Sequence, residues 1–337
     1  MSLRFEKYTL IEKNMKKILV LLLIVSTVYT QKVFSQEKDL TIESSVMGYY
    51  KGLYPKSLKW AQWLTDENKY AYVKDDSYFI VPATTLPDAK DVEQITLENL
   101  QKDFDDLKRL PYFSSISSEQ VVFDQNSNKI IYNYKGREKG KKTSIHYPVG
   151  ASNNDFHNGS QNIAYTIGNN LYIATPSDSM ITVTSKNDKN IVSGQAIHRY
   201  EFGISKGTFW SPSGNTLAFY QKDETEVADY PLLDITTRTG SLNSIKYPMA
   251  GEASEHGKVG IYNVKTKKVI YLKTNQPKDF YVSNVTWGPN EKFVYIVEMN
   301  RGQDHFWFNQ FDASTGEKMK THMMSDDLFN AFNLIIA

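Results

Sequence analysis

The hydrophobic and polar positions repeat one pattern along most of the chain. An aromatic residue is followed by a turn of Asp, Asn, Pro, Gly or Ser, and then by a strand with apolar side chains near positions +7 and +9. The copies begin at Trp63, Phe123, Phe156, Trp210 and Trp287. Because side chains alternate along a strand, positions +7 and +9 lie on the same face. The turn residues are of the types that reverse a chain.

A second strand follows several copies, as at residues 78–81, 171–174 and 259–264, after short turns such as Asn169-Asn170. Repeated antiparallel units of this size are typical of β-propeller blades, which cannot bury their faces alone. At about 40–50 residues per blade, residues 45–320 hold about five to six blades. The sequence therefore predicts an all-β fold, an incomplete β-propeller of four-stranded antiparallel blades. An all-β sandwich with an accidental repeat is the alternative.

One segment departs from the strand pattern. Its apolar residues are spaced as on one face of a helix: Leu97, Leu100, Phe104 and Leu107. Thr96 can cap the start of this helix, and Pro111 can stop it. We expect a short helix that packs between two blades rather than one that binds a partner.

The composition narrows the classes of function. The 337 residues carry 39 Lys and Arg against 38 Asp and Glu, a net charge of +1, whereas nucleic-acid binding needs a clustered basic excess. The chain has no cysteine, which excludes thiol catalysis, thiolate metal sites and disulfides. None of the six histidines is four residues from another, as a zinc-binding pair on a helix would be. We therefore expect no metal, no cofactor and no nucleic-acid partner.

The N-terminal segment has the features of a targeting signal. Lys16 and Lys17 precede an apolar run at residues 18–25, and a cleavage site is expected near Ser35. A basic region, a short apolar region and a small-residue site describe a secretory signal peptide. The run is shorter than the about 20 residues that cross a bilayer. We expect no stable membrane span after cleavage, and an uncleaved membrane anchor is the alternative.

These patterns divide the chain into three parts. Residues 1–35 are a start extension and signal peptide, residues 36–320 are the propeller, and residues 321–337 are a tail without the blade pattern. Met15 is the natural start, since it directly precedes the two lysines. An exported chain without cysteine suits a bacterial envelope, so we expect the protein to be periplasmic or secreted.

One catalytic motif is present in form only. Residues 203–207 match the G-x-S-x-G pattern of a nucleophile elbow around Ser205. That motif works as a sharp turn from a strand into a helix, with an acid and a histidine later in the chain. Here the blade strand at residues 208–210 follows instead. We therefore predict no catalytic residue in this chain.

An ordered set of short motifs resembles the N-terminal propeller of the dipeptidyl peptidase IV family, serine peptidases of the prolyl oligopeptidase clan. The resemblance covers about residues 45–320. The matching segments are Ile191-Val192-Ser193-Gly194, Tyr200-Glu201-Phe202, Phe209-Trp210-Ser211-Pro212, Asp223-Glu224-Thr225-Glu226-Val227, Tyr247-Pro248-Met249-Ala250-Gly251 and Val285-Thr286-Trp287.

This resemblance implies a two-part serine exopeptidase. In the family, an eight-bladed propeller covers an α/β-hydrolase domain with a Ser, Asp and His triad, and the enzyme removes N-terminal dipeptides, often after Pro or Ala. A glutamate pair on the propeller holds the free amine of the substrate. Here Glu201 stands in the family motif Tyr-Glu-Glu as the one acidic residue, followed by Phe202. It is our predicted substrate-binding residue, and a solvated surface carboxylate is the alternative.

Two functions follow from the resemblance. The chain is either the propeller portion of a secreted dipeptidyl aminopeptidase, gating access and holding the substrate amine, or a free-standing periplasmic propeller that binds peptides or proteins. Five to six blades are short of eight, and no hydrolase domain follows, so we expect the chain to be truncated and inactive by itself. The implied partners are the N-terminus of a peptide substrate and, as in full-length family members, a second copy in a homodimer.

Overall fold

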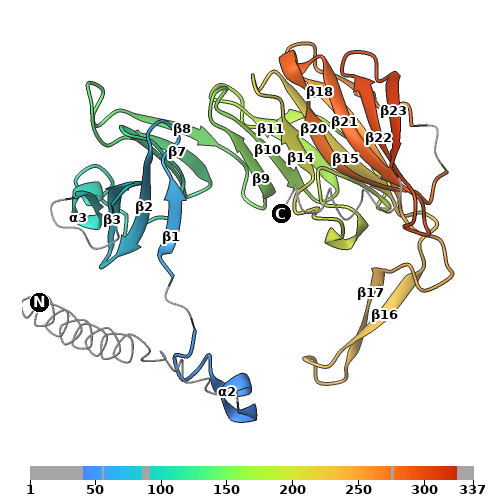
Figure 1. Ribbon diagram of the computed structural model, residues 1–337, viewed down its shortest axis with the longest axis horizontal. Coiled ribbons are helices and arrows are strands. Elements are labelled where there is room, and N and C mark those ends of the chain that lie inside the picture. The colour runs from blue at the N-terminus through green and yellow to red at the C-terminus, as the bar shows by residue number, and fades with distance from the viewer. Residues whose placement is uncertain (1–40, 55–56, 86–91, 275–276, 325–337) are drawn as a thin grey trace, which may run out of the picture. The chain divides into compact units, whose positions relative to one another are not determined.

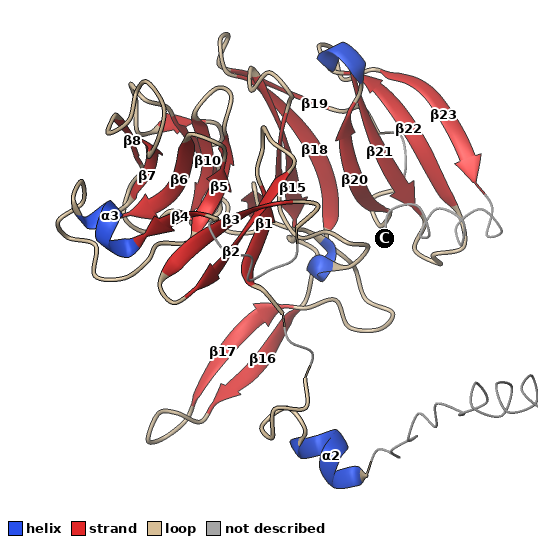
Figure 2. Cartoon of the chain, turned by 60° about the vertical axis from the view of Figure 1, so that its left-hand side comes forward, coloured by secondary structure: helices blue, strands red, loops and turns tan. Residues whose placement is uncertain are grey.

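The computed structural model describes residues 41–54, 57–85, 92–274 and 277–324, and within them almost all regular structure is strand (Figure 2). The chain divides into two compact units, residues 1–58 and 59–337. In the first unit, helix α2 (Ile42–Met47) is capped by Thr41, whose hydroxyl accepts a hydrogen bond from the Ser44 N–H at 3.0 Å. The predicted signal peptide lies outside the described residues. Within those residues no helix is both long and apolar enough to cross a membrane.

The second unit is a series of antiparallel sheets, five of which we call blades 1 to 5 (Figure 1). Blade 1 contains β1 (Lys59–Trp63), β2 (Lys69–Lys74), β3 (Ser77–Pro82) and β4 (Glu93–Thr96). Blade 2 contains β5 (Phe113–Ile116), β6 (Gln120–Gln125), β7 (Asn128–Asn133) and β8 (Lys142–His146). Blade 3 contains β9 (Ser152–His157), β10 (Asn162–Ile167), β11 (Asn170–Ala174) and β12 (Ile181–Thr182).

Blade 4 has a split edge strand and an inserted hairpin. It contains β13 (Ile191–Ser193), β14 (Thr208–Trp210), β15 (Thr216–Asp223), β18 (His256–Asn263) and β19 (Lys268–Tyr271). Both β13 and β14 pair with the same edge of β15. Between β15 and β18, strands β16 (Asp229–Asp234) and β17 (Ser241–Lys246) form a separate two-stranded sheet. Blade 5 contains β20 (Tyr281–Trp287), β21 (Phe293–Met299), β22 (Phe306–Asp312) and β23 (Lys318–Met324).

Each blade packs on the next through side chains that are almost fully buried. Ile131 of blade 2 belongs to one apolar cluster with Tyr165 of blade 3. Leu171 of blade 3 clusters with Phe219 of blade 4, and blade 4 forms a further cluster with Phe311 of blade 5. An inner blade therefore buries apolar side chains on both of its faces, which a two-layer sandwich does not require. The predicted incomplete, all-β propeller is confirmed, and the sandwich alternative is not.

The aromatic residues of the repeated pattern have a defined role at two blade junctions. The indole Nε1 of Trp210, at the end of β14, donates to the Asp155 carbonyl of β9 at 2.9 Å. In the same way Trp287, at the end of β20, donates to the Phe209 carbonyl of β14 at 3.0 Å. The first strands of blades 3, 4 and 5 are thereby joined side by side. Trp63, in the first blade, is 63% exposed.

One copy of the repeat has a different position in its blade. Trp63, Phe156, Trp210 and Trp287 lie in the first strand of their blades, whereas Phe123 lies in β6, the second strand of blade 2. The sequence pattern therefore recurs at Phe123 but marks a different hairpin of the blade there. The turn after Phe123 is rich in Asn and Asp, and such a turn can close either hairpin of a blade.

The predicted helix is present but shorter than its apolar spacing suggests. Helix α3 spans Leu97–Gln101 and begins at Thr96, whose side chain accepts from the Asn99 N–H. Phe104 and Leu107 are buried outside the helix, in the cluster between blades 1 and 2. The Gln101 side chain donates to the Leu107 carbonyl at 2.7 Å. This bond gives the Leu107 carbonyl a partner in the irregular segment that takes the place of a longer helix. Tertiary packing thus ends the helix early.

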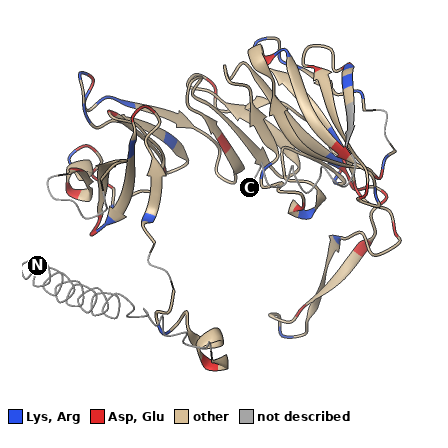
Figure 3. Cartoon of the chain, viewed as in Figure 1, with Lys and Arg blue, Asp and Glu red and all other residues tan. Residues whose placement is uncertain are grey.

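Charged residues of both signs are interspersed over the strands and turns of the described residues (Figure 3). This distribution accords with the net charge of +1 for the whole chain. Several ion pairs are exposed, such as that between Lys141 and Glu138 at 2.8 Å. Exposed pairs of this kind contribute little to stability, so the apolar clusters between blades are the main stabilising feature of the fold.

Candidate functional site

The predicted substrate-binding residue, Glu201, lies on a loop that interrupts the edge strand of blade 4. Ser193 at the end of β13 pairs with Gln221, and Thr208 at the start of β14 pairs with Phe219, so residues 194–207 loop out between neighbouring positions of β15. The base of this loop is closed by backbone hydrogen bonds to Tyr220. The Gly194 N–H donates to the Tyr220 carbonyl at 2.8 Å, and the Tyr220 N–H donates to the Gly207 carbonyl at 2.9 Å.

The two ends of the loop approach each other closely at Gly207. A Cβ placed on Gly207 would lie 2.3 Å from the backbone of Gln195, closer than real Cβ contacts. Because those neighbours are backbone atoms, they cannot rotate away as a flexible side chain would. Glycine is therefore required for the loop to leave the strand at this point.

The tip of the loop has an unusual backbone. His198, Arg199 and Tyr200 have φ values of 49°, 55° and 64°, and Phe202 has a φ of 56°. Residues with a Cβ adopt this left-handed region at a cost of about 1–2 kcal/mol each. Glu201, by contrast, is extended, with φ −73° and ψ 170°. Such a strained run persists only where its surroundings determine it, and strained segments of this kind are concentrated at functional sites.

His198 ties this tip to two other parts of the chain. Its side chain is buried, and the residue is 4% exposed. Its backbone N–H donates to the Glu255 carboxylate, and its Nε2 accepts a hydrogen bond from the Val282 N–H of β20 at 3.0 Å. The imidazole also lies edge-on to the Tyr281 ring, with 5.2 Å between the ring centroids. Blade 5 therefore holds a loop of blade 4.

The residues on either side of Glu201 pack against aromatic rings. The Arg199 guanidinium lies 4.2 Å from the centroid of the Tyr247 ring, within the range of a cation–π interaction. The Phe202 ring lies 5.0 Å from Tyr281, centroid to centroid. These contacts hold the side chains of Arg199 and Phe202 in place on either side of Glu201.

The buried imidazole is neutral. Burial is the main cause that lowers the pKa of His198 to about 3, and the neighbouring Lys222 and His256 contribute to the same shift. Because Nε2 accepts from Val282, the ring proton belongs on Nδ1. Nδ1 lies 3.4 Å from a Glu255 oxygen but is not aligned as a hydrogen bond, so this contact is electrostatic.

The negative charge of Glu255 is neutralised by a nearby lysine. Its second carboxylate oxygen lies 3.5 Å from the Lys222 ammonium, which also pairs with Glu224 at 2.7 Å. Burial lowers the pKa of Lys222, but the charges of Glu255 and Glu224 outweigh burial, so the net shift is upward. Glu255 is thus committed to His198 and Lys222 and does not offer a second free carboxylate beside Glu201.

The Glu201 carboxylate is the available charged group of the loop. The residue is exposed, and among the described residues its side chain has no hydrogen bond or ion pair. Its backbone is held, because its N–H donates to the His198 carbonyl at 3.0 Å and its carbonyl accepts from the Ile204 N–H at 3.0 Å. A held backbone with a free carboxylate is suited to accept hydrogen bonds from a cation such as a peptide ammonium.

The nucleophile-elbow pattern around Ser205 does not have the required geometry. Ser205 is exposed in an irregular segment, and strand β14 begins at Thr208, where an elbow needs a helix. Among the described residues, no group of three or more His, Asp and Glu side chains is placed to hold a metal ion.

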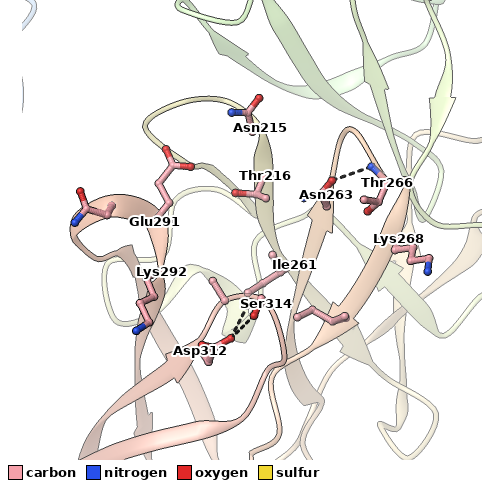
Figure 4. Close-up of a pocket in the computed structure, with 13 residues that line it drawn as sticks. Asn215, Thr216, Ile261, Asn263, Thr266, Lys268, Glu291, Lys292, Asp312 and Ser314 are labelled. Atoms are coloured by element: carbon pink, nitrogen blue, oxygen red, sulfur yellow. Dashed lines mark hydrogen bonds between the residues drawn. The ribbon is translucent and has the colours of Figure 1, made fainter.

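A groove of about 590 Å³ lies elsewhere, between the turns of blades 4 and 5 (Figure 4). The two carboxylates of this groove already accept hydrogen bonds from neighbouring turns. Asp312 accepts from the Ser314 N–H at 2.9 Å and from the Ser314 hydroxyl, and Glu291 accepts from the Ser213 hydroxyl at 2.7 Å. These hydrogen bonds lower the pKa of Asp312. The groove does not include Glu201, and both of its carboxylates are engaged in hydrogen bonds within the fold.

The anchor of the loop was not predicted from the sequence. Glu255 and Val282 follow His198 by 57 and 84 positions, so no local spacing connects them. In the sequence His198 has no histidine four residues away, and the structure places it in the core. The local signal that was available is its position three residues before Glu201.

Comparisons with known proteins agree with the fold. Residues 113–335 match the family model described as the dipeptidyl peptidase IV (DPP IV) N-terminal region. Dipeptidyl aminopeptidase B of Saccharomyces cerevisiae is 26% identical over 286 residues, which are 79% of this chain and 32% of that protein.

The similar solved structures include two from bacteria. A protein from Bacteroides ovatus described as a candidate dipeptidyl aminopeptidase IV has a TM-score of 0.69 and 38% identity, over 80% of this chain and 37% of that one. Dipeptidyl peptidase 4 of Porphyromonas gingivalis has a TM-score of 0.65 at 18% identity, over 88% of this chain and 44% of that one, and so supports the fold alone. The chain spans less than half the length of each of these relatives.

Proposed function

The chain belongs to the dipeptidyl peptidase IV N-terminal region family, and from that premise we propose that it acts as the propeller portion of a secreted serine dipeptidyl aminopeptidase. In this proposal the propeller gates the approach of peptides, and Glu201 holds the free amine of the substrate. The names of the relatives, which are dipeptidyl aminopeptidases, support the reaction.

The observation that carries the proposal is the free carboxylate of Glu201 on a strained, firmly held loop. A peptide N-terminus is an ammonium group with three donors, and a carboxylate accepts such hydrogen bonds. Hydrogen bonds to charged groups contribute about 1.5–3 kcal/mol. The loop leaves the first strand of blade 4, beside the first strands of blades 3 and 5. That position supports a role in gating as well as in binding.

The test is the affinity of the chain for a short Ala-Pro peptide, measured by titration calorimetry with a free and with an acetylated N-terminus. Acetylation removes the ammonium and leaves the rest of the peptide unchanged. We expect the acetylated peptide to bind about 10–100-fold more weakly. Equal affinity for the two peptides contradicts amine recognition.

Export from the cytoplasm is part of the same proposal. It is supported by the basic residues Lys16 and Lys17 and the apolar run at residues 18–25, which together resemble a signal peptide.

The hairpin of β16 and β17 supports the further proposal that the protein forms a homodimer. Among the described residues these two strands pair only with each other, and they expose Leu233 (66%) and Leu242 (73%). Ile235, in the turn that directly follows β16, is 80% exposed. Leu233 and Leu242 are directly opposite in the ladder and so lie on one face. A two-stranded ribbon has little stability alone, and a contiguous exposed apolar patch indicates an interaction site.

We expect the double substitution Leu233→Ser and Leu242→Ser to lower the dimer fraction in sedimentation velocity, because it removes the apolar face without changing charge. The matched control is Val149→Ser, which removes an apolar side chain that is 88% exposed in another part of the surface. A dimer fraction that is the same in the double variant and the unmodified chain contradicts this interface.

A further inference from the structure

We propose that His198 is the positioning residue for Glu201, and that its imidazole fastens the blade 4 loop to the edge strand of blade 5. The inference rests on the proposed amine-binding function, which it deepens. His198 is buried, so its effect on Glu201 is exerted through the loop.

The first step is the hydrogen bond from Val282. Among the strands that the structure describes, β20 is an edge strand of blade 5 and pairs with β21 alone. Val282 is 3% exposed, and its N–H donates to His198 Nε2 at 3.0 Å. A buried backbone N–H needs an acceptor, and leaving one without a partner costs about 1–3 kcal/mol. The imidazole therefore satisfies this N–H of blade 5 at the same time as it fixes the loop.

The second step is the orientation of the ring. The Glu255 carboxylate accepts from the His198 backbone N–H and lies beside Nδ1, while Lys222 balances its charge. A carboxylate beside Nδ1 favours the tautomer with the proton on that atom, which leaves Nε2 free to accept. The charge of Glu255 beside Nδ1 and the Tyr281 ring against the imidazole favour the orientation that accepts the Val282 N–H.

The third step connects the ring to the glutamate. The Glu201 N–H donates to the His198 carbonyl, so a hydrogen bond joins the backbone of Glu201 directly to the residue that is bound to blade 5. The three left-handed residues before Glu201 are costly conformations, and the hydrogen bond between Val282 and His198 offsets that cost. Without it, we expect the loop to leave the left-handed run and the carboxylate to sample many positions, which raises the entropic cost of binding an amine.

The absence of cysteine from the sequence allows a direct measurement. A Glu201→Cys variant carries a nitroxide label at that single cysteine, and its electron paramagnetic resonance spectrum reports the mobility of the loop at position 201. In this background, His198→Phe keeps the ring that packs on Tyr281 but removes the acceptor. His198→Gln is the matched control, because its side-chain oxygen can accept the Val282 N–H.

We expect a sharp, mobile component in the spectrum of the Phe variant and a broad, immobile spectrum in the Gln variant. Hydrogen exchange of the Val282 amide should be about tenfold faster in the Phe variant, as for the loss of one buried hydrogen bond. An immobile spectrum in the Phe variant, or equal mobility in the Phe and Gln variants, overturns the proposal. If His198→Phe does not fold, Val282→Pro removes the other half of the same bond and should also mobilise the label.

A separate measurement distinguishes this proposal from the proposed function. In chains with Glu201 present, His198→Phe should weaken binding of a free-amine Ala-Pro peptide about tenfold, and His198→Gln should restore most of it. Glu201→Gln addresses amine binding alone. If Glu201→Gln leaves the affinity unchanged, the amine-binding function fails, whereas the spin-label spectra still decide whether His198 positions residue 201.

Discussion

Replacing Glu201 by Gln is expected to lower kcat/KM for dipeptidyl substrates with a free N-terminus by about 10–100-fold. The substitution keeps the size and shape of the side chain but removes the charge that attracts the ammonium. A hydrogen bond to a charged group contributes about 1.5–3 kcal/mol. At about 1.4 kcal/mol for each factor of ten, losing it lowers kcat/KM by the expected factor. The measurement uses a chimaera in which this chain replaces the matching segment of the Bacteroides ovatus protein, with a chromogenic Ala-Pro substrate.

Two controls separate amine recognition from general effects. An N-acetylated substrate should respond little to Glu201→Gln, because it has no ammonium to lose. Glu138→Gln removes one negative charge from another exposed position, where the Glu138 side chain is 61% exposed, and should leave kcat/KM unchanged. If the free and acetylated substrates lose rate equally, Glu201 is a solvated surface carboxylate and does not bind the amine.

Replacing Phe311 by Ala is expected to lower the free energy of unfolding by about 3–5 kcal/mol. Phe311 is fully buried, at 0% exposure, in the cluster that joins blade 4 to blade 5. Removing its ring loses apolar burial and leaves a cavity between two sheets that backbone hydrogen bonds hold in place. Urea unfolding followed by far-ultraviolet circular dichroism measures the change.

The matched control for this prediction is Trp63→Ala. Trp63 is a larger aromatic residue but is 63% exposed in blade 1, and we expect its loss to change stability by about 0.5 kcal/mol or less. A small effect at Phe311 would mean that blades 4 and 5 do not depend on this contact. It would also weaken the case that blade 5 can hold the Glu201 loop in place.

The position of the candidate site was predicted from the sequence, but the backbone conformation and the contacts that form it were not. Glu201 is found because Tyr200-Glu201-Phe202 and the neighbouring motifs resemble the family. Nothing in those residues shows that the backbone around Glu201 is left-handed, or that the carboxylate is free while Glu255 is engaged. Short motifs specify which residue is present, whereas the state of its side chain depends on the groups that surround it in space.

By itself the sequence determined the blades, because their signals are local. Alternation of side chains and turn-forming residues act over fewer than about ten neighbouring positions. The copies at Trp210 and Trp287 each end a strand before a turn, as the pattern predicts. Only the tertiary structure decided where α3 ends and what holds Glu201. The Val282 N–H reaches His198 across 84 positions of the chain. Such a contact exists only after blades 4 and 5 have packed, since burial of their apolar faces, and no local preference, brings the two residues together.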